Sequence, residues 1–262
     1  MELIFKIIKF EFSNALRSKW IIFYFSFFVL LSFLMFNFEN DSGKAVLSLM
    51  NVVLIIIPLV SIIFGTMYVY NSNDYIQMVL CQPLDRRSLY FGLYLGNAIP
   101  LALSFVFGIV IGFVFNGIDP VGITPVLILA INGFALTLIF TSIAFLTAIK
   151  FTDKAKGLGA SLLIWLMLAV IYDGFILFVT YFFRDYPIEN IILALSLVNP
   201  IDLARIFFIL DFNISALMGY TGALFNKFFG TSLGVIVSIS LMIVWFIIPF
   251  LFGLRSFNKK DF

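Results

Sequence analysis

The sequence predicts an all-α membrane protein with six transmembrane helices, and three observations support this. Of its 262 residues, 63% are hydrophobic and 11% are charged, a composition far from that of soluble domains. Six apolar stretches are each long enough to cross about 30 Å of hydrocarbon as a helix. The lysines and arginines fall almost entirely in alternate gaps between these stretches. This pattern is typical of spans that cross a bilayer in alternating directions.

The six predicted spans are residues 20–36, 46–70, 91–115, 124–149, 158–183 and 231–254. Pro58, Pro100 and Pro249 lie inside the second, third and sixth spans, where each removes a backbone hydrogen bond and predicts a kink. Gly108 and Gly112 form a G-x-x-x-G pattern in the third span, which permits close contact with another helix.

The basic residues predict the orientation of these spans. With a cytoplasmic N-terminus, 12 of the 16 lysines and arginines lie on the cytoplasmic side, and Lys44, Arg184, Arg205 and Lys227 lie on the other. The twelve are Lys6, Lys9, Arg17, Lys19, Arg86, Arg87, Lys150, Lys154, Lys156, Arg255, Lys259 and Lys260. Since short cytoplasmic segments carry an excess of such residues, both termini are predicted to be cytoplasmic.

Residues 1–19 predict an amphipathic helix rather than a span. Polar residues recur at steps of three and four on one face, and apolar residues occupy the opposite face. The polar face carries Glu2, Lys6, Lys9, Ser13 and Arg17. Such a helix lies in the membrane interface with its lysines toward anionic headgroups, and it also serves as a topogenic anchor.

The connector at residues 71–90, between the second and third spans, is longer than antiparallel helices require. It reads as a short amphipathic helix, a turn at Pro83, and a new helix that Asp85 or Ser88 caps. We interpret it as a cytoplasmic contact surface; the alternative is a passive, well-capped turn. The candidate contact residues are Asp74, Tyr75, Met78, Val79, Pro83, Arg86 and Arg87. The basic loop at 150–157 is a second candidate.

Residues 184–230 form the longest stretch outside the spans and are predicted to be external. Three apolar or amphipathic runs indicate helices, which either lie flat in the outer leaflet or dip in and return. Asn199 and Pro200 break the chain, and Pro200 suits the first position of the next helix. We predict an external platform here, with Asn199, Pro200, Asp202 and Arg205 contacting an external partner.

Asp173 is the acidic residue near the middle of the fifth span. Such an acid costs about 2.5–3.5 kcal/mol on insertion scales, so a partner, a proton or water must offset it. We therefore predict that Asp173 faces the bundle interior or a dimer interface. Its functional interpretation is a transport path or coupling hinge, together with Tyr172, and the alternative is a protonated carboxyl bonded to a neighbouring helix. Because Tyr172 is adjacent in sequence, it points to a different helix face.

Missing residue types narrow the functions further. The chain has no G-x-x-x-x-G-K-[ST] phosphate loop, so it is not expected to hydrolyse ATP itself. It has no histidine and one cysteine, Cys81, which argues against Cys/His metal sites, Ser-His chemistry and an internal disulfide. A net charge of +2 gives no indication of nucleic-acid binding. We expect neither enzymatic activity nor a cofactor in this chain.

The whole chain resembles the type-2 permeases of ABC transporters. An amphipathic elbow helix (1–19) precedes a six-span permease domain (20–262), with a coupling segment at 71–90 and an external segment at 184–230. Residues 78–92 read Met-Val-Leu-Cys-Gln-Pro-Leu-Asp-Arg-Arg-Ser-Leu-Tyr-Phe-Gly, where the family commonly has Leu-Leu-x-x-Pro-x-x-Arg and then Gly. The family usually places several Glu residues before this motif, and residues 71–74 are Asn-Ser-Asn-Asp instead.

The resemblance implies a homodimer in a bacterial inner membrane, with two ATPase subunits that bind ATP and Mg²⁺ and drive the permease. Three motifs are similar to the NosY branch, the permeases of nitrous oxide reductase maturation: Tyr172-Asp173, the run 199–205 and the Gly219–Ala223 turn. That branch implies a periplasmic copper-handling partner. The alternatives are an exporter of a lipid, drug or other small apolar substrate, and a membrane scaffold that anchors a periplasmic complex without transport.

Overall fold

The computed structural model describes residues 2–39, 42–82, 85–117, 120–183, 189–211 and 232–260. All regular elements in these ranges are helices: α1 (Glu2–Leu16), α2 (Lys19–Phe38), α3 (Ser42–Asn71), α4 (Asn73–Leu80), α5 (Arg86–Phe115), α6 (Pro120–Lys150), α7 (Lys154–Leu166), the π-helix η1 (Met167–Ile171), α8 (Tyr172–Phe182), α9 (Glu189–Val198), α10 (Pro200–Asp211) and α12 (Ser232–Lys259). Six are long and apolar enough to cross a membrane, counting α7, η1 and α8 together as the fifth. The prediction of an all-helical, six-span fold is confirmed.

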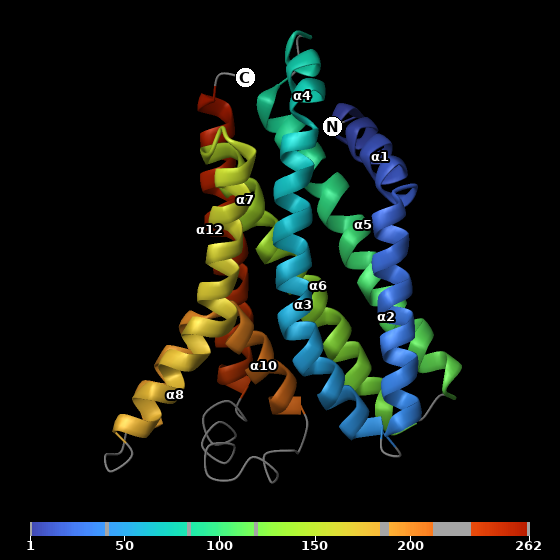
Figure 1. The fold of residues 1–262 in the computed structure, drawn as a ribbon, viewed down its shortest axis with the longest axis vertical. Coiled ribbons are helices and arrows are strands. Elements are labelled where there is room, and N and C mark those ends of the chain that lie inside the picture. The colour runs from blue at the N-terminus through green and yellow to red at the C-terminus, as the bar shows by residue number, and fades with distance from the viewer. Residues whose placement is uncertain are drawn as a thin grey trace.

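The spans run up and down, so that one end of the bundle collects most of the cytoplasmic features predicted from the sequence. Figure 1 shows α1, α4, the α6–α7 connection and the C-terminal part of α12 at this end, which we call the N–C end. Arg86, the first residue of α5, joins α5 to the end of α12, because its Nη1 donates to the carbonyl oxygens of Asn258 (3.1 Å) and Lys260 (2.9 Å). The start of α5 therefore holds the last turn of α12.

The core forms where α3 packs on α6 and α2 packs on α5. The G-x-x-x-G pattern supplies the second of these contacts. A Cβ at Gly108 would lie 2.8 Å from Cβ of Phe28, and one at Gly112 would lie 2.5 Å from Cβ of Ser32. Any larger residue would push α2 and α5 apart, and the Ser32 hydroxyl, which donates to Ile109 O at 3.2 Å, would lose its acceptor.

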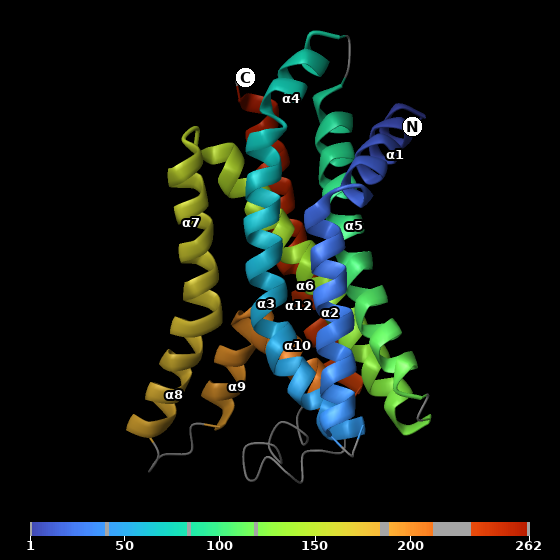
Figure 2. The same cartoon turned by 45° about the vertical axis from the view of Figure 1, so that its right-hand side comes forward.

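The fifth span stands at the edge of the bundle. Figure 2 shows α7 and α8 as a separate column beside α3, and none of the residues in its apolar window is buried. Near the N–C end it is attached by a buried trio of hydroxyls. Ser161 of α7 lies 2.8 Å from Thr66 of α3 and 2.6 Å from Thr147 of α6. The π-helix η1 then interrupts the span at mid-length.

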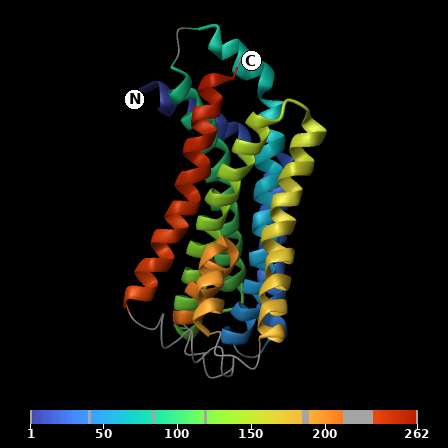
Figure 3. The same ribbon diagram turned by 90° about the vertical axis from the view of Figure 1, so that its left-hand side faces the viewer.

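Helices α9 and α10 form a bent pair, with an angle of 112° between Ile191–Val198 and Pro200–Phe208. Figure 3 shows this orange pair between α8 and α12, in the half of the bundle away from the N–C end. Such a bend is expected of a broken span or of a segment that dips into the membrane and returns, and we call α9 and α10 together the re-entrant pair. Pro200 begins α10 as predicted, whereas the Gly219–Ala223 turn lies outside the described residues.

Candidate functional site

A cluster of polar side chains that includes two acids and an arginine lies where α9 meets α10. We call it the apex cluster and define it as Tyr172, Asp173, Asn199, Asp202 and Arg205. Asn199 and Asp202 are almost fully buried, with 0% and 4% of their surface exposed. The cluster joins the re-entrant pair to the fifth span.

The broken backbone at the apex explains part of this chemistry. A helix end leaves carbonyl groups without partners, and apolar surroundings offer no water to replace them. Tyr172 Oη donates to Leu195 O at 2.7 Å, and Trp245 Nε1 donates to Val198 O at 3.0 Å. Asn199 Nδ2 donates to Leu168 O, inside the π-helix, at 2.9 Å. Side chains thus satisfy carbonyls of both α9 and η1.

Asn199 also starts α10. Its Oδ1 accepts a hydrogen bond from Ile201 N at 3.1 Å, and its Nδ2 donates to Asp202 Oδ2 at 3.1 Å. The amide side chain therefore caps the new helix and orients the acid in its first turn. This explains locally why an Asn-Pro pair followed by Asp forms a tight apex.

Arg205 links two acids from different helices. Its Nη1 lies 2.9 Å from Asp202 Oδ1, one turn earlier in α10, and its Nη2 lies 3.0 Å from Asp173 Oδ2 in α8. The side chains of Arg205 and Asp173 are 33% and 32% exposed on the surface of this single chain. One guanidinium therefore holds two carboxyl groups, and the Asp173 pair is the ion pair among the bonds that join the fifth span to the re-entrant pair.

The structure brings together residues that the sequence assigned to different roles. Asp173 has the partner that its position in a span demanded, and this partner is Arg205. Tyr172 and Asp173 bond to different helices of the pair, Tyr172 to Leu195 O of α9 and Asp173 to Arg205 of α10. Direct contact of Asn199, Pro200 and Asp202 with an external partner does not fit their burial, because these side chains are turned into the bundle.

The second candidate site lies at the N–C end, on α4 and the start of α5. Ile76 and Val79 are buried against the bundle, and Tyr75 stacks on Phe10 of α1 at 6.1 Å between ring centroids. The opposite face of α4 is open, with Met78 59% exposed. The helix is thus fastened along one side and free along the other.

The predicted contact residues of this segment divide into two groups. Asp74, Met78 and Arg87 are exposed and available to a partner, whereas Val79 and Arg86 hold the segment in place. Asp85 is the residue that caps α5, by accepting from Arg87 N at 3.5 Å. Pro83 lies outside the described residues. The neighbouring α6–α7 loop is fixed by Tyr70 Oη, which donates to Phe151 O at 2.9 Å.

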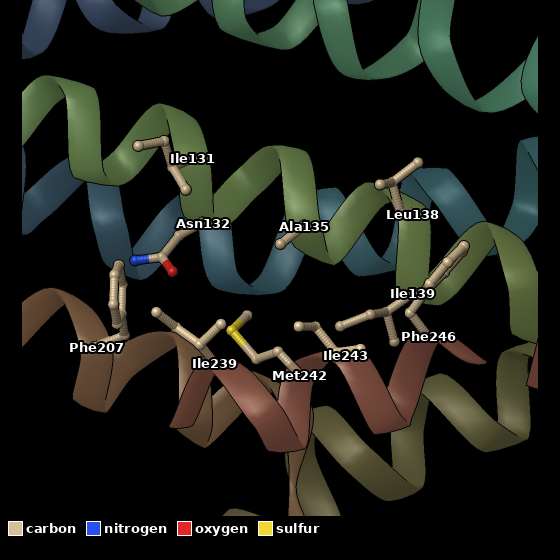
Figure 4. Close-up of a pocket in the computed structure, with 10 residues that line it drawn as sticks. All are labelled: Ile131, Asn132, Ala135, Leu138, Ile139, Phe207, Ile239, Met242, Ile243 and Phe246. Atoms are coloured by element: carbon tan, nitrogen blue, oxygen red, sulfur yellow. The ribbon is translucent and has the colours of Figure 1, made fainter. Parts of the chain in front are cut away.

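An apolar pocket of about 260 Å³ opens between α6, α10 and α12. Figure 4 shows Asn132 pointing from α6 toward Phe207 of α10, with Ile239 and Met242 of α12 beside it. Asn132 Nδ2 is buried, with no hydrogen-bond partner in the described part of the chain. The pocket offers apolar walls and a single amide donor.

Comparison with known proteins agrees with this architecture. Residues 5–262 match the family described as ABC-2 family transporter protein. The chain belongs to the ABC-2 family. A member of this family is a membrane component of a transporter, and an ABC permease works with an ATPase subunit. Membership therefore implies that this ABC-2 permease works with an ATPase partner subunit.

The ABC-2 permease is also similar to a curated protein described as "Probable ABC transporter permease protein NosY" from Pseudomonas aeruginosa. The two are 22% identical over 240 residues, which cover 84% of this chain and 86% of that protein. Among the described residues of the permease, no three Cys, Asp or Glu side chains gather closely enough to hold a metal ion.

Two features of the permease escaped sequence reasoning. Trp245 donates to the end of α9 from a span that reads as uniformly apolar, and no pattern in the sequence marks it. The second is Glu11, which lies on the side of α1 that packs on α5 and is 5% exposed. A signal for Glu11 existed, because the stripe Ile4, Ile8, Ala15 at helical spacing includes position 11, where an acid replaces an apolar residue.

Proposed function

We propose that this permease transmits motion from a cytoplasmic ATPase subunit, through its fifth span, to the re-entrant pair at the external face. The ATPase contacts Asp74, Met78 and Arg87, and the N–C end lies in the cytoplasm of a bacterial cell. The positive-inside pattern of the sequence supports this orientation. The exposed face of α4 supports the contact, because it leaves an amphipathic helix without a partner on one side.

The observation that carries the proposal is the way in which the fifth span is held. It makes few contacts along its length, but polar groups attach it near the N–C end through Ser161 and at mid-length through Asp173 and Leu168 O. A helix fixed at such points and interrupted by η1 between them moves with whatever displaces its start. Its start is the α6–α7 loop, which lies at the same end of the bundle as α4.

We further propose that the working unit is a homodimer in which a second copy covers the fifth span. Ionised groups are costly against lipid, and Asp173 and Arg205 are about one-third exposed on an otherwise apolar column. A second copy with the same column would remove both side chains from lipid. A two-fold arrangement would also present two α4 surfaces to two ATPase subunits.

For the biological task we propose maturation of the copper site of nitrous oxide reductase, with an external copper-handling protein as partner. The similarity to the NosY-named protein and the matching runs at 172–173 and 199–205 support this assignment. Deletion of the gene should leave the reductase protein present but deficient in copper. A deletion strain whose reductase carries its full copper content would refute the assignment.

Contact with the ATPase is testable through Cys81, the single cysteine of the chain, which is exposed between α4 and α5. A maleimide–benzophenone probe on Cys81 should crosslink to the ATPase subunit in membranes. The control moves the cysteine to the end of α2 that lies away from the N–C end, by combining Cys81→Ser with Phe38→Cys. Position 38 is 80% exposed there and should not crosslink. Crosslinking from both positions, or from Phe38→Cys alone, would contradict the proposed orientation.

A second candidate function is export of a small apolar substrate, which the apolar pocket beside Asn132 favours. Export predicts that the ATPase activity of the reconstituted complex rises with such a compound and that Asn132→Leu abolishes the rise.

A third possibility is a scaffold without turnover. A scaffold would support the reductase equally well when its ATPase subunit binds but does not hydrolyse ATP, whereas a coupled permease would not.

A further inference from the structure

A second pocket, of about 590 Å³, lies at the N–C end between α1, α2, α3 and α5. We call it the elbow pocket. It is separate from the apex cluster and from the exposed face of α4. Its lining includes polar groups, notably Glu11, Tyr68 and Asn97, and apolar groups such as Phe64. A cavity of this composition at the end of a span lies at the level of lipid headgroups.

Glu11 enters this pocket because α1 lies directly on α5. Gly96 makes the approach possible, since a Cβ at this position would collide with Cβ of Glu11. The carboxyl is consequently buried, with 5% of the residue exposed, and it forms no ion pair with a described side chain. Burial raises the pKa of Glu11 above its ordinary value of 4.5, and the nearby Tyr68 hydroxyl opposes this in part.

One further polar atom in the elbow pocket lacks a partner. Asn97 is 93% buried, and its Nδ2 makes no hydrogen bond to any residue the structure describes, whereas the Tyr68 hydroxyl lies next to the Glu11 carboxyl. Buried groups of this kind are nearly always satisfied in folded proteins. An acid, an amide donor and a phenol around one cavity thus point to a polar ligand that both donates and accepts.

The rim of the pocket carries a cationic side chain and two aromatic side chains. Arg17 is exposed at the turn between α1 and α2 and lines the cavity. Trp20, 66% exposed, lies edge-on to Phe64 at 6.2 Å between ring centroids. Aromatic side chains at this depth favour the boundary between headgroups and acyl chains. The ligand therefore needs a cation for Glu11, an anion for Arg17, and apolar chains for the aromatic side.

We propose that the elbow pocket binds one phospholipid with a primary ammonium headgroup, phosphatidylethanolamine. Its ammonium donates to Glu11, its phosphate accepts from Arg17 and Asn97, and its acyl chains follow Trp20 and Phe64 into the bilayer. Phosphatidylcholine matches the charges but has no N–H to donate, and phosphatidylglycerol has no cation. A lipid in this position contacts α1 and the first three spans at once, so it fixes the elbow helix to the bundle.

Lipid retention measures this selectivity. The permease is reconstituted in nanodiscs of equal parts phosphatidylethanolamine, phosphatidylcholine and phosphatidylglycerol, then released, and its co-purifying lipids are quantified by native mass spectrometry. We expect about a three- to tenfold preference for phosphatidylethanolamine in the wild type, the equivalent of about 0.7–1.4 kcal/mol. Glu11→Gln should abolish the preference, and Glu11→Asp should retain part of it.

The control is Asp74→Asn, which removes an exposed acid at the same end and should keep the wild-type selectivity. Size-exclusion profiles of all variants show whether they fold. Equal retention of the three lipids by the wild type would overturn the proposal, as would a preference that survives in folded Glu11→Gln. A preference for phosphatidylglycerol would show that Arg17 acts alone, and it would overturn the proposal too.

Discussion

Replacing Arg205 by Gln should destabilise the permease far more than replacing Asp173 by Asn, although the two side chains share one ion pair. Arg205 makes two charge-assisted hydrogen bonds, at 2.9 and 3.0 Å, to Asp202 and Asp173. Its loss leaves two carboxyl groups without a cation. Asp173→Asn removes one of two acids, keeps an amide oxygen as acceptor, and leaves the Arg205–Asp202 pair one to one.

The magnitude follows from burial. Breaking a fully buried ion pair from one side costs about 3–5 kcal/mol. Because Arg205 and Asp173 are about one-third exposed, we discount this cost to about 2–3 kcal/mol for Arg205→Gln. For Asp173→Asn we expect less than about 1 kcal/mol. For a chain of this size, the two losses correspond to falls in melting temperature of about 6–10 °C and less than about 3 °C.

The assay is thermal unfolding in lipid nanodiscs, followed by intrinsic fluorescence. Arg87→Gln is the matched control, because it removes an exposed guanidinium at the other end and should change the melting temperature by less than about 2 °C. The double variant Asp173→Asn with Arg205→Gln should recover part of the stability lost in Arg205→Gln. Equal losses in the two single variants, or no recovery in the double variant, would refute the charge argument.

Two further predictions concern the N–C end. Ser161→Ala should lower the free energy of unfolding by about 0.6–1.7 kcal/mol, because Thr66 and Thr147 keep carbonyl acceptors in their own helices, and Ser240→Ala, which removes a hydroxyl bonded only to its own helix, should have no measurable effect. Thermal unfolding measures both variants, and an equal loss of stability in the two would exclude the hydroxyl trio as an anchor. In detergent without phosphatidylethanolamine, the wild type should lose stability as pH rises through the raised pKa of Glu11, since this contribution is complete only below about pH 4.5. Glu11→Gln removes the titrating carboxyl, which faces Tyr68, Tyr75 and Asn97, and should flatten this dependence above about pH 4.5; an unchanged slope would exclude Glu11 as its source.

Most of the bundle could be predicted because lipid imposes simple constraints. Each span must be apolar and about 20 residues long, and cations mark one side, so composition and period define the six helices. The Gly108–Gly112 pattern likewise indicated a close contact, and the structure supplies its partner, α2. What the pattern could not give was the identity of that partner, since any helix with a small surface fits it.

The apex cluster shows why the candidate site was harder to predict. The position of Asp173 in a span indicated that it has a partner, but an acid in a span does not indicate which residue that partner is. Arg205 lies 32 residues away, in a segment whose own sequence suggested an external platform. Only the reversal of direction at Asn199–Pro200 brings the two together, and whether a short helix pair lies flat or dips depends on tertiary packing against α8 and α12.

The Ser161 hydroxyl trio and the apex cluster together show how a span with few packing contacts can still be held at a defined position. Along α7 and α8, apolar side chains face outward and specify no position, since lipid and protein interiors are equally apolar. Position is instead specified by Ser161, Leu168 O and Asp173, each of which loses a hydrogen-bond partner in another helix if the span slides. A span held in this way has few discrete positions, because intermediate ones break hydrogen bonds in an apolar medium. Discrete positions are what a permease requires if ATP binding at one face is to produce a defined change at the other.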